Sequence, residues 1–358
     1  MKRLCALILF LCMAASFSGC DIQETSGVDT AAVSETGVGS AVVIETETSE
    51  TSAATTEAGA HFEFKPLVMS SIFRDIMGED MCLAYSNYID AVRAGEDSFE
   101  VKSEHDYDWM IGQFPAQFQP LYFISTESGY GGAYKDGRAT FQYKIPKDEL
   151  KVKEAEFKKK VTGILNENLR DDYSDLEKVL ALYLYISKNC SYDYDALELD
   201  PLEMDKQLSS YRFLFENKGI CFECAGAYNY LLLQAGVECA SIGGLCHNDN
   251  EGHAWSYVTI NGKNYHVDPT YAMGDPSNLS YFMMTDSQRE MEGNFVKSEM
   301  SIGCHYKEDH NGDKYDADDD SFAPLWGGTF SSFDHEKKLI HYYDKEGKEA
   351  VFDYSAWG

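Results

Sequence analysis

The chain has 358 residues, of which 44% are hydrophobic, so it is long enough to bury one large or two small cores. Its 60 Asp and Glu residues against 30 Lys and Arg give a formal charge of −30, which excludes nucleic acid as a partner. The longest apolar run, residues 4–17, is shorter than the ~20 residues of a membrane-spanning helix, and ten cysteines do not indicate a small disulfide scaffold.

Residues 1–19 have the pattern of a secretory signal peptide, because two basic residues precede the apolar run and a Ser-Gly pair follows it. Residues 17–20 also resemble the bacterial lipoprotein cleavage box, although Phe17 stands where Leu is usual. The resemblance implies cleavage before Cys20 and attachment of diacylglycerol to Cys20. The alternative is an ordinary signal peptide followed by an incidental cysteine. We therefore expect a lipid anchor at Cys20 and a location at the bacterial cell surface, outside the cytoplasm.

Residues 20–61 are predicted to be a disordered tether. Residues 21–60 contain 13 Ser and Thr, eight acidic residues, and no basic or aromatic residue. Such a segment cannot bury enough apolar surface to offset the entropy of ordering it. Forty flexible residues span roughly 35 Å root-mean-square, so the tether would hold the folded part close to a membrane surface.

Residues 62–150 are predicted to be an N-terminal lobe of mixed helix and strand. A helical pattern occupies residues 81–92, and residues 121–125 and 139–145 have the composition of strands. Turns between them are indicated by four glycines, Gly129, Gly131, Gly132 and Gly137. No chemistry is evident in this segment, so a structural role is the simplest interpretation.

Residues 151–300 are predicted to form the main domain. Helices are expected over residues 148–170 and 174–190, the second with Ser174 as its N-cap and Glu177 completing a capping box. A buried helix is expected over residues 221–235, because small and large apolar residues recur through it and Gly236 provides a stop.

Strands are predicted after this helix, over residues 237–242, 253–260 and 264–267. The dipeptide Asn261-Gly262 is typical of a two-residue hairpin turn, so the last two strands should pair antiparallel.

Residues 301–358 are predicted to contain an acidic loop over residues 308–320 and a hairpin of strands 329–334 and 339–343. The acidic loop begins like a calcium loop at Asp316. However, Ser321 replaces the glycine that the sharp turn needs, and Gly327 replaces the bidentate glutamate. A solvated acidic loop is therefore favoured over a calcium site.

Three residues in chain order point to thiol chemistry. Cys221 begins a predicted helix, where the positive end of the helix dipole stabilises a thiolate and unpaired N–H groups can hold an oxyanion. His253 opens a strand, and Asp268 ends the next strand of the same hairpin. A histidine can accept the thiol proton, and a carboxylate on the neighbouring strand, ~4.8 Å away, can orient the imidazole.

The motifs around these residues resemble the transglutaminase-like superfamily. They are Gly219-Ile220-Cys221-Phe222-Glu223-Cys224-Ala225, His253-Ala254-Trp255 and Tyr265-His266-Val267-Asp268-Pro269-Thr270. The resemblance covers about residues 160–290 and implies an α+β, papain-like fold, in which a helix with the nucleophilic cysteine packs on an antiparallel sheet. It also implies that Cys221 is the nucleophile, His253 the base and Asp268 the orienting acid.

Further positions support the resemblance or depart from it. Tyr192-Asp193 follows the preceding helix, and Tyr281-Phe282-Met283 resembles the strand after the family's Asp motif. Cys224 stands where the family often has Tyr or Phe, and Ser256 where it often has Asn. Neither departure removes a member of the triad, but each could alter substrate preference or the oxyanion site.

Other interpretations of the same residues remain open. Each triad residue alone could be structural, and Cys221-x-x-Cys224 is also a redox motif, although antiparallel hairpins follow it instead of a βαβ unit. A zinc site would draw its ligands from Cys221, Cys224, Cys239, Cys246 and His247, but the spacing of Cys239 and Cys246 fits no familiar knuckle. A disulfide could join two of Cys190, Cys224, Cys239, Cys246 and Cys304.

The sequence therefore predicts a surface-anchored thiol enzyme that acts on amide or peptide bonds and needs no cofactor or metal. Its substrate would be a protein or peptide in the cell envelope or outside the cell. Hydrolysis is favoured over transfer to an amine, because no acceptor site is evident. The alternative is a catalytically inactive, surface-displayed binding or scaffold protein with the same fold.

Overall fold

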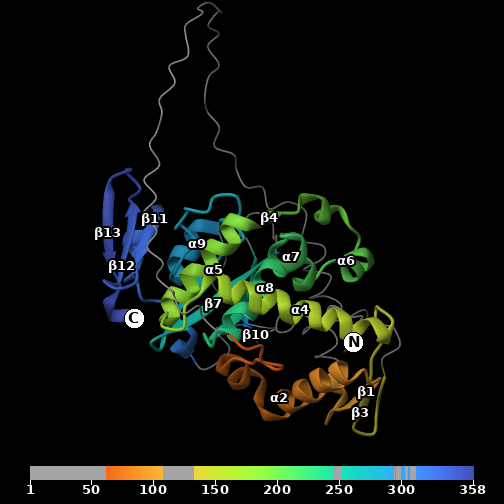
Figure 1. The fold of residues 1–358 in the computed structure, drawn as a ribbon. Coiled ribbons are helices and arrows are strands. Elements are labelled where there is room, and N and C mark those ends of the chain that lie inside the picture. The colour runs from red at the N-terminus through yellow and green to blue at the C-terminus, as the bar shows by residue number, and fades with distance from the viewer. Residues whose placement is uncertain are drawn as a thin grey trace, which may run out of the picture.

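Helix α8 (Cys221–Gln234) lies at the centre of the molecule and packs on a five-stranded antiparallel sheet (Figure 1). The computed structural model describes residues 62–107, 133–245, 252–293, 295, 300–302, 305–306 and 312–358. Every residue of α8 except Phe222 is buried, which is the expected state of a helix that is apolar on all sides. The expected α+β architecture, with a cysteine-bearing helix on an antiparallel sheet, is confirmed.

The central sheet has the strand order β10-β9-β6-β7-β8. Its strands are β6 (Cys239–Leu245), β7 (Gly252–Ile260), β8 (Lys263–Val267), β9 (Ser301–Ile302) and β10 (His305–Tyr306). The turn between β7 and β8 is the predicted one, because Asn261 and Gly262 both have positive φ, 51° and 76°, as a type I′ hairpin requires. Ser256 lies opposite Val267 in this hairpin, which fixes the register that brings Asp268 past the end of β8.

Strand β6 lies two to three residues later in the chain than the predicted 237–242, and β7 and β8 each begin one residue earlier than predicted. Strand β6 begins at Cys239 rather than at Val237, because the chain is still completing the end of α8 there. Gly236 has φ 86°, and the Val237 amide donates to the Leu232 carbonyl at 2.9 Å. This left-handed helix termination delays the strand by two residues.

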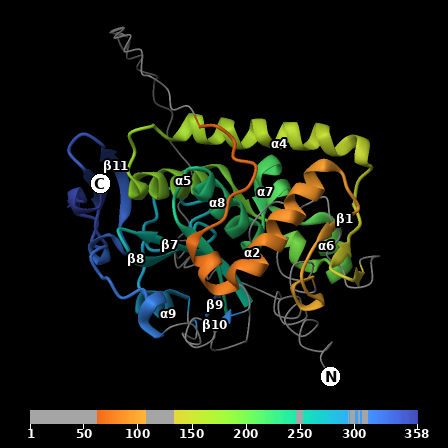
Figure 2. The same cartoon turned by 90° about the horizontal axis from the view of Figure 1, so that it is seen from below.

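Four α-helices lie between residues 147 and 216, just before α8 in the chain. They are α4 (Lys147–Asn168), α5 (Asp175–Asn189), α6 (Pro201–Gln207) and α7 (Ser210–Glu216), and a short parallel pair, β4 (Ser191–Tyr192) and β5 (Lys218–Gly219), leads into α8. The predicted capping box of α5 is present, since the Ser174 amide donates to Glu177 and the Glu177 amide donates to the Ser174 hydroxyl. Figure 2 shows α4 running along one side of the molecule.

The N-terminal segment has a small core of its own. Helix α2 (Ser71–Ala94) packs on a sheet of order β1-β3-β2, formed by Ser98–Glu100, Tyr134–Lys135 and Arg138–Thr140. The helix is longer than the predicted 81–92 and is kinked at Gly78, where φ is 77°. Strand β3 ends earlier than the predicted 139–145, because Phe141 and Tyr143 pack against α2 and against each other. The predicted strand 121–125 lies outside the described residues.

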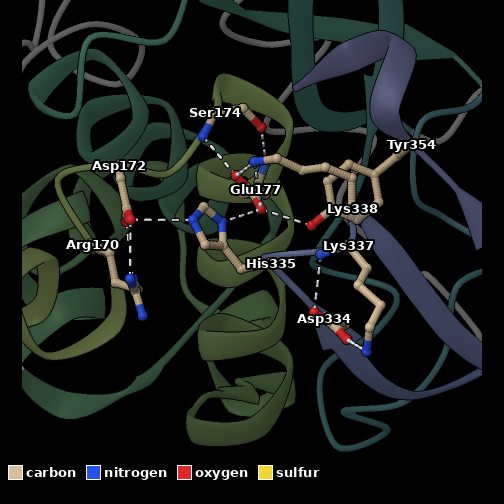
Figure 3. A network of polar contacts seen from close by, with 9 residues as sticks. All are labelled: Arg170, Asp172, Ser174, Glu177, Asp334, His335, Lys337, Lys338 and Tyr354. Atoms are coloured by element: carbon tan, nitrogen blue, oxygen red, sulfur yellow. Dashed lines mark hydrogen bonds and ion pairs between the residues drawn. The ribbon is translucent and has the colours of Figure 1, made fainter. Parts of the chain in front are cut away.

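The C-terminal segment forms three antiparallel strands rather than the predicted hairpin. Strands β11 (Thr329–Asp334) and β12 (Leu339–Tyr343) have the predicted bounds, and β13 (Glu349–Asp353) pairs with β12. The sheet is joined to α5 through the buried carboxylate of Glu177, as Figure 3 shows. His335, Lys338 and Tyr354 all contact this carboxylate.

A further expectation is wrong. Residues 281–283 form a turn and bends instead of a strand, because Met283 has the left-handed φ of 54°, and Met284 makes an isolated bridge to His266. In the described part of the acidic loop the acidic side chains are exposed or half-buried, as expected, whereas Tyr315 and Ala317 are buried. Asp319 is paired with Lys263 of β8.

No helix in the described ranges is both long enough and apolar enough to cross a membrane.

Candidate functional site

Cys221 is the first residue of α8 and is only 1% exposed. Helix α8 packs on β7, the strand that carries His253, so the two residues belong to elements in direct contact. The N–H groups of the first helical turn have no intrahelical acceptor, which leaves them available to an anion near the sulfur. Cys221 therefore has the helix-start position that the sequence predicted.

The turn that presents Cys221 is held by a buried ion pair. Glu223, which is fully buried, accepts from the Ile220 amide at 3.1 Å and from Arg212 through Nε at 3.0 Å and Nη2 at 2.7 Å. Arg212 also donates to Asp193 at 2.8 Å. Two guanidinium bonds to one carboxylate fix direction as well as distance, so this network positions the backbone on both sides of Cys221.

Gly219 shows how closely this network packs. A Cβ at this position would lie 2.7 Å from the Phe213 ring and 2.8 Å from the Glu223 carboxylate. The glycine of the motif is therefore required by packing of the turn against its own ion pair.

His253 and Asp268 form a buried pair on the sheet. The His253 Nε2 and Asp268 Oδ2 atoms are 2.8 Å apart, and the residues are 4% and 0% exposed. The Thr270 amide donates to the other carboxylate oxygen at 3.0 Å. Burial opposes ionisation of Asp268, but His253, Arg289 and the Thr270 amide outweigh it and hold the pKa of this carboxyl below its usual range.

Arg289 is a member of this cluster that the sequence analysis missed. It lies on α9 (Asp286–Gly293), is fully buried, and donates from Nη2 to Asp268 Oδ2 at 2.8 Å. Its guanidinium carbon lies 4.5 Å from the ring centroid of Trp255, 4.3 Å from that of Phe295 and 5.2 Å from that of Tyr271. Its surroundings in the sequence are polar and carry no motif, so only the three-dimensional contacts identify it.

A second buried histidine supports Trp255 from the other side. The Trp255 indole N–H donates to His266 Nδ1 at 2.9 Å, so His266 must donate through Nε2 to Asp286, 2.7 Å away. The Trp255 ring is nearly parallel to the His253 ring, with centroids 5.8 Å apart, and Tyr271 stacks on His253 at 4.7 Å. The aromatic side chains thus limit rotation of the His253 imidazole.

The cysteines of the alternative interpretations are deeply buried. Cys224 and Cys239 are fully buried, and burial raises the pKa of both thiols well above the usual range. Cys82, Cys190, Cys221, Cys224 and Cys239 are free thiols. Within the described ranges, no group of three or more His, Cys, Asp or Glu side chains is arranged to hold a metal ion. Cys20, Cys246, His247 and Cys304 lie outside these ranges.

Comparison with known proteins agrees with this geometry. Residues 163–269 match the family model described as the transglutaminase-like superfamily. The curated Kyphoscoliosis peptidase of Mus musculus is 27% identical over 122 residues, which are 31% of this chain and 18% of that protein. The chain therefore spans less than a fifth of the length of this relative.

Two solved structures are similar to parts of this chain. A candidate cysteine protease from Cytophaga hutchinsonii is 17% identical, with 43% of this chain and 42% of the other covered and a TM-score of 0.26. A structure described as a TGase is 13% identical, with 47% and 48% covered and a TM-score of 0.29. Cys221, His253 and Asp268 all fall within the span of the family model, which covers both the helix and the hairpin. The chain therefore contains a domain of the transglutaminase-like superfamily, as the sequence motifs predicted.

Proposed function

We propose that this protein is a thiol enzyme that acts on amide or peptide bonds through Cys221, His253 and Asp268. The observation that carries the proposal is the buried His253–Asp268 pair on the sheet against which the Cys221 helix packs. Asp268 engages Nε2 of the imidazole, so proton exchange with a thiol would use Nδ1. The peptidase and protease names of the similar proteins agree with this reaction class.

The reaction proceeds in two steps. The Cys221 sulfur bonds to the carbonyl carbon, the C–N bond breaks, and the thiol proton passes through His253 to the leaving amine. Water then adds to the thioester carbon, the C–S bond breaks, and the proton that the water releases passes through His253 to the Cys221 sulfur. Backbone N–H groups at the start of α8 hold the oxyanion in both steps. An amine in place of water would give cross-linking, and we favour water because no amine site is evident.

The same proposal places the enzyme at the cell surface. A lipid on Cys20 and the acidic segment of residues 20–61 would keep the domain near the membrane, with a protein or peptide of the envelope or the exterior as substrate. The support for this part is the sequence pattern of residues 1–61 alone.

A second candidate function has one specific observation in its favour. Cys221 and His253 are only 1% and 4% exposed, so a substrate cannot reach either residue without displacing other groups. A surface-displayed binding protein that has kept the fold without turnover would tolerate this burial.

Limited alkylation distinguishes the two candidates. The full chain is treated with a small amount of iodoacetamide at pH 6–7, and the label is located by mass spectrometry. If the protein is an enzyme, iodoacetamide should label Cys221 at least roughly ten times faster than the other thiols. Cys190 is an internal reference, because burial raises its pKa to about 12.

Three variants complete the experiment. His253→Ala and the isosteric Asp268→Asn should each slow labelling of Cys221, whereas Cys224→Ser should leave it fast, since only the redox and zinc interpretations need both cysteines. Equal labelling of all thiols in the wild type supports the binding protein. Loss of reactivity in Cys224→Ser alone would contradict the triad.

A further inference from the structure

The burial of the Arg289 side chain is energetically unfavourable. It is fully buried, and within the described residues its Nε and Nη1 atoms have no hydrogen-bond acceptor. Burying N–H groups of a cation without acceptors destabilises the folded state, and the aromatic faces of Trp255 and Phe295 offset only part of this cost. An apolar side chain would fill the same space at lower cost, so the positive charge itself requires an explanation.

The charge acts on one oxygen atom. Asp268 Oδ2 accepts from Arg289 Nη2 at 2.8 Å and lies 2.8 Å from His253 Nε2, so the arginine and the imidazole share the same carboxylate oxygen. A buried carboxylate paired with an imidazole alone would favour the imidazolium. A fixed guanidinium on that oxygen compensates the carboxylate and repels a second positive charge nearby.

We propose that Arg289 is a positioning residue of the site: it compensates the charge of Asp268 and so keeps His253 neutral until the Cys221 thiol transfers its proton. This inference rests on the proposed function. A general base must be unprotonated before the reaction, and a histidine that shared a dry site with an uncompensated carboxylate would already hold a proton at neutral pH. The cluster of Arg289, Asp268 and neutral His253 has no net charge, which suits its deep burial.

The remaining titratable groups around Arg289 do not supply a competing charge. Tyr281 is neutral near pH 7, because its pKa, ordinarily ~10, is raised further by burial. On α9 itself, Glu292 accepts from Gln288 at 3.1 Å, and Asp286 is bound to His266. Asp268 is thus the carboxylate that Arg289 compensates.

The test is a pH titration of His253 by NMR in the full chain. Cys221→Ala serves as the background, because it removes the coupled titration of the thiol, and the His253 signal is assigned by its loss in His253→Ala. Arg289→Met and Arg289→Gln should raise the midpoint of the His253 titration by about one pH unit or more. Arg289→Lys, which keeps the charge, should leave it close to the wild-type value.

A double-mutant cycle separates charge from packing. Asp268→Asn should lower the midpoint, because Arg289 then faces the imidazole without compensation, and adding Arg289→Met should move it back upward. Lys338→Met is the matched control, since it removes a cation from another buried carboxylate, Glu177, and should leave His253 unchanged. If Arg289→Met proves unfolded in a thermal melt, Arg289→Gln carries the test, because it keeps a donor for Asp268.

A merely structural role predicts a different pattern. In that case Arg289→Gln and Arg289→Lys would behave alike, and neither would move the midpoint, which overturns the inference. Alkylation of Cys221 reports on the proposed function separately. If His253→Ala does not slow it, the enzyme proposal fails even where Arg289→Gln shifts the midpoint. If His253→Ala slows it and the midpoint stays fixed, the enzyme proposal stands without this role for Arg289.

Discussion

Replacing Glu177 with Gln should strongly destabilise the protein by loosening the C-terminal sheet. The Glu177 carboxylate is 1% exposed and accepts from the Ser174 amide and the Tyr354 hydroxyl, both at 2.7 Å. It also lies 2.6 Å from His335 Nδ1 and 3.2 Å from Lys338 Nζ (Figure 3). Glutamine has nearly the same shape as glutamate but carries no charge. Its NH₂ group would face groups that now donate hydrogen bonds to the carboxylate, so donor would face donor.

The size of the effect follows from these contacts. Removing one partner of a buried ion pair costs about 3–5 kcal/mol, and the lower end applies because Lys338 and His335 keep some contact with water. We therefore expect the free energy of unfolding to fall by about 3 kcal/mol. The melting temperature should then fall by roughly 6–12 °C, at ~2–4 °C per kcal/mol for a domain of this size.

The pH dependence gives the sharper test. Burial raises the pKa of Glu177, but Tyr354, the Ser174 amide, His335 and Lys338 outweigh it, so the folded pKa is below the usual value. The stability from the ionised carboxylate is therefore complete above the unfolded pKa of ~4.3 and is lost as pH falls through the lower folded value. Between pH 5 and pH 3 the wild type should approach the stability of Glu177→Gln.

Urea unfolding across this pH range measures the difference. Glu336→Gln is the matched control, because Glu336 is exposed in the turn between β11 and β12. The control should differ from the wild type by less than ~0.5 kcal/mol. A Glu177→Gln deficit equal to that of the control, or one that persists unchanged at pH 3, would refute the argument.

Two further predictions concern the segment before the described domain. The mature N-terminus should be a lipidated Cys20; mass spectrometry of membrane-bound protein from a bacterial host should find it, and a soluble product with unmodified Cys20 would contradict it. Deleting residues 21–58 should leave the melting temperature unchanged, because the segment has no aromatic residue and no base and cannot form a core. A fall of several degrees would show that the segment packs on the domain.

Local signals in the sequence were sufficient for much of the fold. The cap of α5, the end of α8 at Gly236 and the Asn261-Gly262 turn each depend on residues within a few positions of one another. The same holds for His253 and Asp268, because the β7–β8 hairpin brings them together, and α8, which begins at Cys221, packs on β7. The sequence analysis missed strand β13. Apolar and polar residues alternate only weakly over residues 349–353, and the strand forms by pairing with the edge of β12.

Contacts between distant segments left no such signal. Glu177 meets His335, Lys338 and Tyr354 across 158 to 177 residues, and the capping box explains its position on α5 without them. Arg289 meets Asp268 across 21 residues from a helix whose composition is polar. A buried arginine in a polar segment has the same sequence pattern as an exposed arginine. The hydrophobic periodicity of the sequence therefore cannot distinguish the two.

Three of the buried acids of the domain show why motifs alone leave the chemistry incomplete. Glu177, Glu223 and Asp268 each combine a backbone N–H with a basic side chain, from Lys338, Arg212 and Arg289 respectively. In a chain with twice as many acids as bases, these cations are placed where an uncompensated carboxylate would be most costly. The family motifs contain Glu223 and Asp268 but neither of their arginines, which come from other helices. The motif therefore contains the groups to which the proposed function assigns proton transfer, whereas the cations that compensate its buried carboxylates lie outside it.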